Sequence, residues 1–297
     1  MIRKNNSSNP RFRPTRRAVM RFGGAAAVAL AGGAAAAGIA ANASEVGLTA
    51  VFGPSKEDLE AELAEKIDAY LADSGTEIEA SVAIERGEMH LDYNADQTHI
   101  TASIVKAEIL AMMLQYYGSA EAITVDHREL LELMITQSDN DATTELYNFL
   151  GGTEALHAAH ERYGLQNTTN DEDGRWGVTH TIAADQLIIA ELDLFEGTFA
   201  ADQVGLAREL MGSVVEEQNW GISAAAKEGE SIWLKNGWDT ESQLGGLWVV
   251  NSIGVLGGDG DDPISLTVLT SNAQDDVEGI PVVEDIAKIA REVIDQL

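Results

Sequence analysis

The chain of 297 residues is 45% hydrophobic and 23% charged, which suits a globular protein with a packed core. It has 49 acidic and 19 basic residues, and its net charge of −30 argues against binding to nucleic acid phosphates or anionic lipid surfaces. The absence of cysteine excludes disulfides, thiolate metal sites and a cysteine nucleophile. The acidic excess indicates either a solvated surface that favours solubility or adaptation to high salt, which screens the repulsion.

The N-terminal segment has the pattern of an export signal. Arg16-Arg17 lies in a basic stretch before a weakly apolar Ala/Gly run, and Ala41-Asn42-Ala43 fits an A-x-A cleavage site. The paired arginines resemble a twin-arginine signal. We therefore predict that residues 1–43 direct export and that residues 44–297 are extracytoplasmic. The alternative is an uncleaved membrane anchor, since residues 22–41 are uncharged and just long enough to span a bilayer.

The first elements expected in the exported chain are a helix and a hairpin. Apolar residues recur every four positions from Leu59 to Leu71 after a serine cap, which predicts an amphipathic helix that ends at Gly75. Alternating apolar residues over 78–84 predict a strand, and a turn at Arg86-Gly87-Glu88 leads to a second strand through Leu91.

The middle of the chain has helical periodicity, and strand-like segments return after it. The segments with apolar spacing of three or four lie near 103–117, 128–137, 141–150, 153–163, 181–194 and 200–216. A long polar loop occupies 163–180. Strand-like segments follow at 231–238, 247–256 and 264–272, and the last predicted helix begins at Pro281.

This order favours an α+β fold. Strands at both ends of the chain, with helices between them, predict one antiparallel sheet of about five strands flanked by terminal helices. The helical block at about 103–216 would form a second lobe. We expect a monomer.

Two of three short motifs with candidate chemistry lie at helix starts. Ser103 and Lys106 are three residues apart and share one helix face, where a lysine of lowered pKa could take the serine proton. The positive end of the helix dipole would favour the developing negative charge. Ser138-Asp139-Asn140 lies between two helices, where loops often carry function. Both motifs have a structural alternative, since serine, aspartate and asparagine also cap helices.

The third motif is Lys235-Asn236-Gly237, at the end of an apolar strand. A lysine in such a strand either extends its amine to solvent or binds an anion. A further pair, His157 and His160, does not have the spacing of a zinc-binding helix, and we expect it on a helix surface.

The order S-x-x-K, S-D-N and K-x-G resembles class A β-lactamases and penicillin-binding proteins. The segment MITQSDNDATTELYNFLGG is especially similar to its class A counterpart, and the resemblance extends from about residue 55 to the end. It implies a β-lactamase/transpeptidase-like fold and a serine hydrolase that works through an acyl-Ser103 intermediate, with no metal or cofactor.

The resemblance also implies a role for each matching residue. Ser103 would attack the acyl carbonyl, Lys106 would be the base or orient it, and Ser138 would relay a proton to the leaving nitrogen. The backbone N–H groups of Ser103 and Trp238 would form the oxyanion hole. Asn140 would bind the substrate amide and Lys235 its carboxylate. The substrate-binding set is therefore Asn140, Lys235, Asn236, Gly237 and Trp238.

Three departures from the family pattern concern activity. Asn236 replaces the usual threonine or serine, and the interval from Ser103 to Ser138 is shorter than in typical class A enzymes. The loop glutamate that activates the deacylating water is also missing, because Gly177 follows Arg175-Trp176. Glu172 is the nearest candidate, although a run of adjacent acids is more typical of a solvated turn.

Three functions remain open at this point. The first is hydrolysis of a β-lactam. The second is a D-alanyl-D-alanine peptidase, or penicillin-binding protein, that acts on the stem peptide of peptidoglycan. The third is a degenerate member of the family that binds cell-wall peptide or a protein partner without catalysis. Without a deacylating base, a serine enzyme can acylate and then stall.

Overall fold

An antiparallel sheet of five strands forms the centre of the computed structural model, which describes residues 53–195 and 197–297. The predicted export signal therefore lies outside the described residues. The strand order is β2-β1-β7-β6-β5. The strands are β1 (Glu79–Arg86), β2 (Met89–Tyr93), β5 (Ile232–Glu241), β6 (Leu247–Leu256) and β7 (Ile264–Ser271). The predicted α+β fold and its sheet are confirmed.

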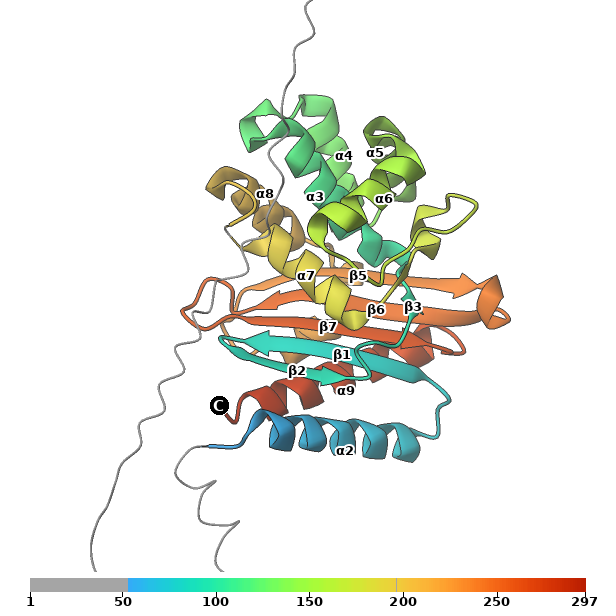
Figure 1. The fold of residues 1–297 in the computed structure, drawn as a ribbon, viewed down its shortest axis with the longest axis vertical. Coiled ribbons are helices and arrows are strands. Elements are labelled where there is room, and N and C mark those ends of the chain that lie inside the picture. Colours follow the sequence, from blue (N-terminus) through green and yellow to red (C-terminus); the bar gives the residue numbers. More distant parts are fainter. Residues whose placement is uncertain (1–52, 196) are drawn as a thin grey trace, which may run out of the picture.

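Two helices from opposite ends of the described chain cover one face of the sheet (Figure 1): α2 (Lys56–Ser74) and α9 (Asp276–Ile294). Both bury apolar residues against the same core cluster as β1, β6 and β7. The start of α9 differs from the prediction, because Asp275 caps the helix by accepting a 2.9 Å hydrogen bond from the Glu278 N–H. Pro281 thus lies inside the helix rather than at its start.

The helical lobe covers the opposite face of the sheet (Figure 1). Its helices are α3 (Val105–Tyr117), α4 (Val125–Thr136), α5 (Asn140–Leu150), α6 (Gly152–Tyr163), α7 (Ala183–Leu194) and α8 (Ala201–Met211). All six helices expected in this region are present, with shifted ends. Helix α7 packs directly on β1, β6 and β7, while α3 lies at the centre of the lobe, with ten consecutive buried residues from Val105 to Leu114. This packing gives α3 a fixed orientation relative to the sheet.

A small second sheet was not predicted. It pairs β3 (His99–Ile100) with β4 (His180–Thr181), and the Thr101 N–H donates to the Thr179 carbonyl at 2.9 Å. The segment before Ser103 is thereby joined to the end of the polar loop at 163–180. Thr181 belongs to this strand, and α7 begins only at Ala183.

The expectation of a surface histidine pair is correct for only one member. His157 is exposed, whereas His160 is 2% exposed and its Nε2 lies 3.2 Å from the Oε1 of buried Glu108 on α3. Helix α6 turns Ala159 and Tyr163 inward as well. His157 therefore lies on the outer face of α6 and His160 on its inner face.

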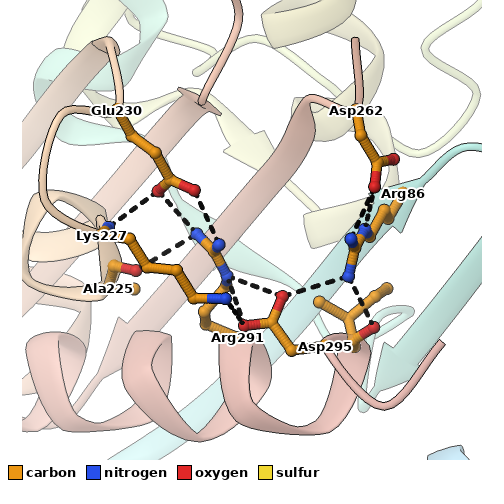
Figure 2. A network of polar contacts seen from close by, with 8 residues as sticks. Arg86, Ala225, Lys227, Glu230, Asp262, Arg291 and Asp295 are labelled. Atoms are coloured by element: carbon orange, nitrogen blue, oxygen red, sulfur yellow. Dashed lines mark hydrogen bonds and ion pairs between the residues drawn. The ribbon is translucent and has the colours of Figure 1, made fainter. Parts of the chain in front are cut away.

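An ion-pair network joins the end of α9 to β1 and to the turn before β5 (Figure 2). The Arg291 guanidinium donates to both carboxylate oxygens of Glu230 at 2.7 and 2.8 Å, and to Asp295 at 2.9 Å. Asp295 also binds Arg86 at 3.1 Å and Lys227 at 2.6 Å. Three of the chain's few basic side chains therefore stabilise the packing of α9.

Over the described residues, every helix is too short or too polar to cross a membrane.

Candidate active site

Ser103 lies in a short turn of 3-10 helix, Ala102–Ile104, that leads directly into α3. The turn is strained, because Ala102 before the serine has a φ of 46°. Ser138 has a φ of 57°, which places it in the left-handed region as well. Each such non-glycine residue costs about 1–3 kcal/mol and persists where its surroundings impose it, often at functional sites. Ser138 itself, and Ala102 directly before Ser103, thus occupy imposed conformations.

Lys106 joins the first motif to the second. Its Nζ lies 2.9 Å from Ser103 Oγ, 3.0 Å from Ser138 Oγ and 2.7 Å from Asn140 Oδ1. A fourth contact, at 2.6 Å, runs to the Ser138 carbonyl. An ammonium has three protons, so it cannot donate to all four oxygens at once. In its neutral form the amine has two protons to donate and a lone pair that can accept the Ser103 hydroxyl proton.

The electrostatics favour that neutral amine. The Lys106 side chain is fully buried, and burial lowers its pKa to about 7, although Asp139 and Asp239 oppose the shift. A base whose pKa lies near neutrality is suited to accept and return a proton. The helix position alone would leave the amine protonated, so the lowered pKa depends on burial by the tertiary structure.

Lys235 reaches the same hydroxyl from β5. Its Nζ donates to Ser138 Oγ at 3.0 Å and to the Asn236 carbonyl at 2.7 Å. The side chain is 1% exposed, and burial together with the nearby Lys106 lowers its pKa well below the usual value. Ser138 Oγ therefore lies between two amines, and it separates Lys235 from the open cavity.

The other two residues of the third motif position β5. The Asn236 amide donates to the Gln218 carbonyl at 2.8 Å and to the Trp220 carbonyl at 2.9 Å. It therefore points away from the cavity, contrary to its expected contact with substrate. A Cβ on Gly237 would lie only 2.6 Å from the backbone nitrogen of Ser103. Glycine is needed there because β5 passes against the turn that holds Ser103.

A cavity of about 1060 Å³ opens over these residues. Its lining includes four of the predicted site residues, Ser103, Ser138, Asn140 and Trp238. Lys106, Lys235, Asn236 and Gly237 lie buried outside the lining. The structure thus separates the predicted set into residues that face the cavity and residues that support them.

The polar loop does not bring Glu172 to the cavity. Glu172 is exposed and is not part of the lining, while its neighbour Asp171 is buried and binds Arg175 through two contacts of 3.0 and 2.9 Å. The indole of Trp176 lies beside Lys106 instead, with its ring centroid 5.1 Å from Lys106 Nζ. In the sequence, Arg175-Trp176 marks only the place where the family's loop glutamate is missing, and no pattern there indicates a role for the indole.

Two acidic residues of the cavity were also missed. Asp239 and Glu241 follow Trp238 on β5, and both line the cavity. Their alternating positions along one strand, directly after the third motif, were the signal that could have identified them.

The comparisons with known proteins agree with this fold. The model of the beta-lactamase enzyme family matches residues 113–296, which is more than half of the chain, so the protein belongs to that family. The match begins after Ser103 and Lys106. Among curated proteins, the chain is 25% identical over 167 residues to LppW of Mycobacterium tuberculosis, which is named as a lipoprotein. That alignment covers 53% of this chain and 52% of LppW, so the chain spans about half the length of the curated relatives it matches.

Solved structures show the same architecture. A class A beta-lactamase from Bacteroides cellulosilyticus superposes with a TM-score of 0.67 at 14% identity, over 80% of this chain and 98% of that one. A mutant of PBP-A, described as an acyl-enzyme complex with penicillin G, superposes with a TM-score of 0.65 at 18% identity, over 80% of this chain and 97% of that one. At these identities the likeness establishes the fold alone.

Proposed function

We propose that the protein is an exported serine hydrolase of this family that opens a β-lactam or a related amide through an acyl-Ser103 intermediate. The observation that carries the proposal is the position of Lys106. Its buried Nζ contacts Ser103 Oγ, Ser138 Oγ and the Asn140 side chain at once, inside the cavity wall. A lysine with only a structural role would not need the hydroxyls of two strained turns as partners.

Acylation follows from these contacts. Neutral Lys106 takes the proton of Ser103 as Oγ attacks the acyl carbonyl, and a C–O bond forms. The negative charge on the carbonyl oxygen is stabilised by the backbone N–H groups of Ser103 and Trp238. The C–N bond then breaks, and Ser138 donates its proton to the leaving nitrogen. Lys106, 3.0 Å from Ser138 Oγ, returns the proton to Ser138.

The second half of the reaction is release of the acyl group. The carboxylates that line the cavity are those of Asp239 and Glu241 on β5, whereas the loop presents Trp176 to Lys106. An apolar ring at this place excludes water rather than activating it. We therefore propose that the acyl-enzyme is long-lived. This favours the penicillin-binding or peptidase function over rapid β-lactam hydrolysis.

Intact mass against time, after the protein is mixed with benzylpenicillin, tests the proposal. We expect a covalent adduct of one drug molecule that persists for hours, and no adduct with Ser103→Ala. Ser213→Ala, which changes a serine outside the cavity lining, serves as the matched control. An adduct that clears while the drug is consumed would instead indicate a β-lactamase. The absence of any adduct would contradict the acylation step itself.

The location outside the cytoplasm is part of the proposal and rests on the sequence of residues 1–43. A chain without cysteine cannot carry the lipid anchor that is attached through that residue. Replacement of Arg16-Arg17 by two lysines is expected to retain the protein inside the cell, as measured by fractionation. Unchanged export would contradict the twin-arginine assignment.

A further inference from the structure

The charged side chains that line the cavity are mainly acidic, although the site behind them contains two lysines. Both lysines of the site are buried outside the cavity lining and have lowered pKa values, so they contribute less positive charge than exposed lysines would. The charged side chains of the lining are Arg175, Asp239 and Glu241. Arg175 is bound through two contacts to Asp171, which offsets its charge. The two acids therefore dominate the field of the cavity.

Glu241 is the more unusual of the two acids. It is only 6% exposed, although it lines the cavity. Its Oε1 accepts hydrogen bonds from Ser242 Oγ at 3.0 Å and from the Gln243 N–H at 3.2 Å. Within residues 53–195 and 197–297, its Oε2 accepts none. Both of these bonds come from the next two residues of the chain, so the carboxylate can still accept a hydrogen bond from a ligand in the cavity.

Asp239 lies nearer to the reacting centre. Its carboxylate is exposed and accepts a 2.7 Å bond from the Thr240 N–H, which leaves its second oxygen free to bind a ligand. It is close enough to Lys106 to raise the pKa of that amine. Asp239 is also next to Trp238, whose backbone N–H is assigned to the oxyanion hole. An acyl group on Ser103 would therefore pass beside Asp239.

We propose that Asp239 and Glu241 form a subsite for a cation, and that the preferred substrates are amides or lactams whose acyl part carries an ammonium or guanidinium group. The inference rests on the proposed function, because it assigns a substrate class to the same cavity. The chain's net charge of −30 would also attract such substrates over a distance and repel anionic ones.

Three penicillins that differ mainly in side-chain charge test the subsite. Ampicillin carries an ammonium, benzylpenicillin has no charge on its side chain, and carbenicillin carries a carboxylate there. We expect the rate of adduct formation to fall in that order, by about fivefold for each step, as for partly exposed ion pairs. The spread should narrow when salt is raised from about 0.1 M to about 1 M.

Substitutions locate the effect. Asp239→Asn and Glu241→Gln are each expected to reduce the ratio of the ampicillin rate to the carbenicillin rate by about threefold or more. Asp261→Asn is the matched control, because this exposed acid lies in the turn after β6, at the opposite end of that strand from Trp248 of the cavity. It should leave the ratio unchanged. Asp239 is exposed, so its variant is expected to fold even where Glu241→Gln does not.

Equilibrium dialysis with Ser103→Ala, which cannot acylate, separates the two proposals. Adducts that form at equal rates, or in the reverse order, would overturn the cation subsite and leave the proposed function intact. No adduct, but retention of ampicillin over carbenicillin that is lost with Asp239→Asn, would overturn the acylation and support the subsite. No adduct and equal retention would overturn both.

Discussion

The proposed chemistry depends on Lys106, whose properties have both local and distant causes. Its spacing from Ser103 is set by one helical turn, whereas Ser138 and Asn140 reach it from the start of α5. Burial then makes the neutral amine accessible near neutral pH. The rate of acylation should report that protonation state directly.

We expect the rate of adduct formation with benzylpenicillin to rise with pH, with a midpoint near the Lys106 pKa of about 7. Below that pKa the amine is protonated and cannot accept the Ser103 proton, so the rate should fall about tenfold for each pH unit. Lys106→Arg should abolish the adduct, because the guanidinium stays protonated. A rate that is constant from about pH 5 to about pH 9 would show that another group is the base.

Gly237 offers a second test at the scale of one residue. Gly237→Ala would place a methyl group 2.6 Å from the nitrogens of Ser103 and Ile104, so β5 or the turn that holds Ser103 must move. We expect acylation to slow by about 100-fold, the effect of a misplacement near 1 Å. Gly205→Ala in α8 is the control, since its Cβ would meet nothing within 4 Å. Equal acylation rates in the two variants would contradict the close approach.

The position of Trp176 depends on other elements, because its loop is held by the β3–β4 pair and by the Asp171–Arg175 contact. We expect Trp176→Glu to shorten the life of the benzylpenicillin adduct, since it would place a carboxylate beside Lys106, where water could be activated. Trp176→Phe, which keeps an aromatic ring, should leave the adduct long-lived. Equal lifetimes in both variants, measured by intact mass, would show that the ring does not control deacylation.

At the scale of elements, the packing of α9 depends on the ion-pair network shown in Figure 2. The contact with Arg291 lowers the pKa of Glu230 to about 2. A carboxylate whose folded pKa is depressed stabilises the fold above its ordinary value near 4.5, and this stability is lost as pH falls through 2. Glu230→Gln should reduce the free energy of unfolding at pH 7 by about 2 kcal/mol, because it leaves Arg291 without its closest partner.

The loss of stability caused by Glu230→Gln should become smaller as pH is lowered toward 2, where Glu230 itself becomes protonated. Urea denaturation at several pH values measures it. Lys56→Gln, which breaks an exposed pair with Glu60 on α2, is the control and should change stability by less than about 1 kcal/mol. A loss for Glu230→Gln that stayed constant with pH would point to packing rather than charge.

At the scale of the whole molecule, the net charge of −30 dominates. Repulsion among carboxylates should be screened by salt, so we expect the Tm to rise between about 0.1 M and about 2 M KCl. Sucrose, which favours compact states without screening charge, is the control for general solvent effects. A Tm that does not rise with KCl would argue against adaptation to high salt and leave solubility as the reason for the acidic surface.

The elements and motifs that depend on local sequence were predictable. Apolar periodicity identified the strands of the sheet and the helices of the lobe, because side-chain burial repeats every two or about 3.6 residues along an element. The spacing of Ser103 and Lys106 was sufficient to place them on one face of a helix. The order of the three motifs then identified the family and the cavity residues Ser138, Asn140 and Trp238.

Only the tertiary structure decided which way certain side chains point and what surrounds them. Asn236 turns to the Gln218 and Trp220 carbonyls, and Glu172 stays in solvent while Trp176 lies against Lys106. Each of these outcomes depends on segments brought together from distant parts of the chain. The direction in which a side chain points, its burial and its pKa depend on its neighbours in the folded protein, whereas residue type and local spacing are set by the sequence itself.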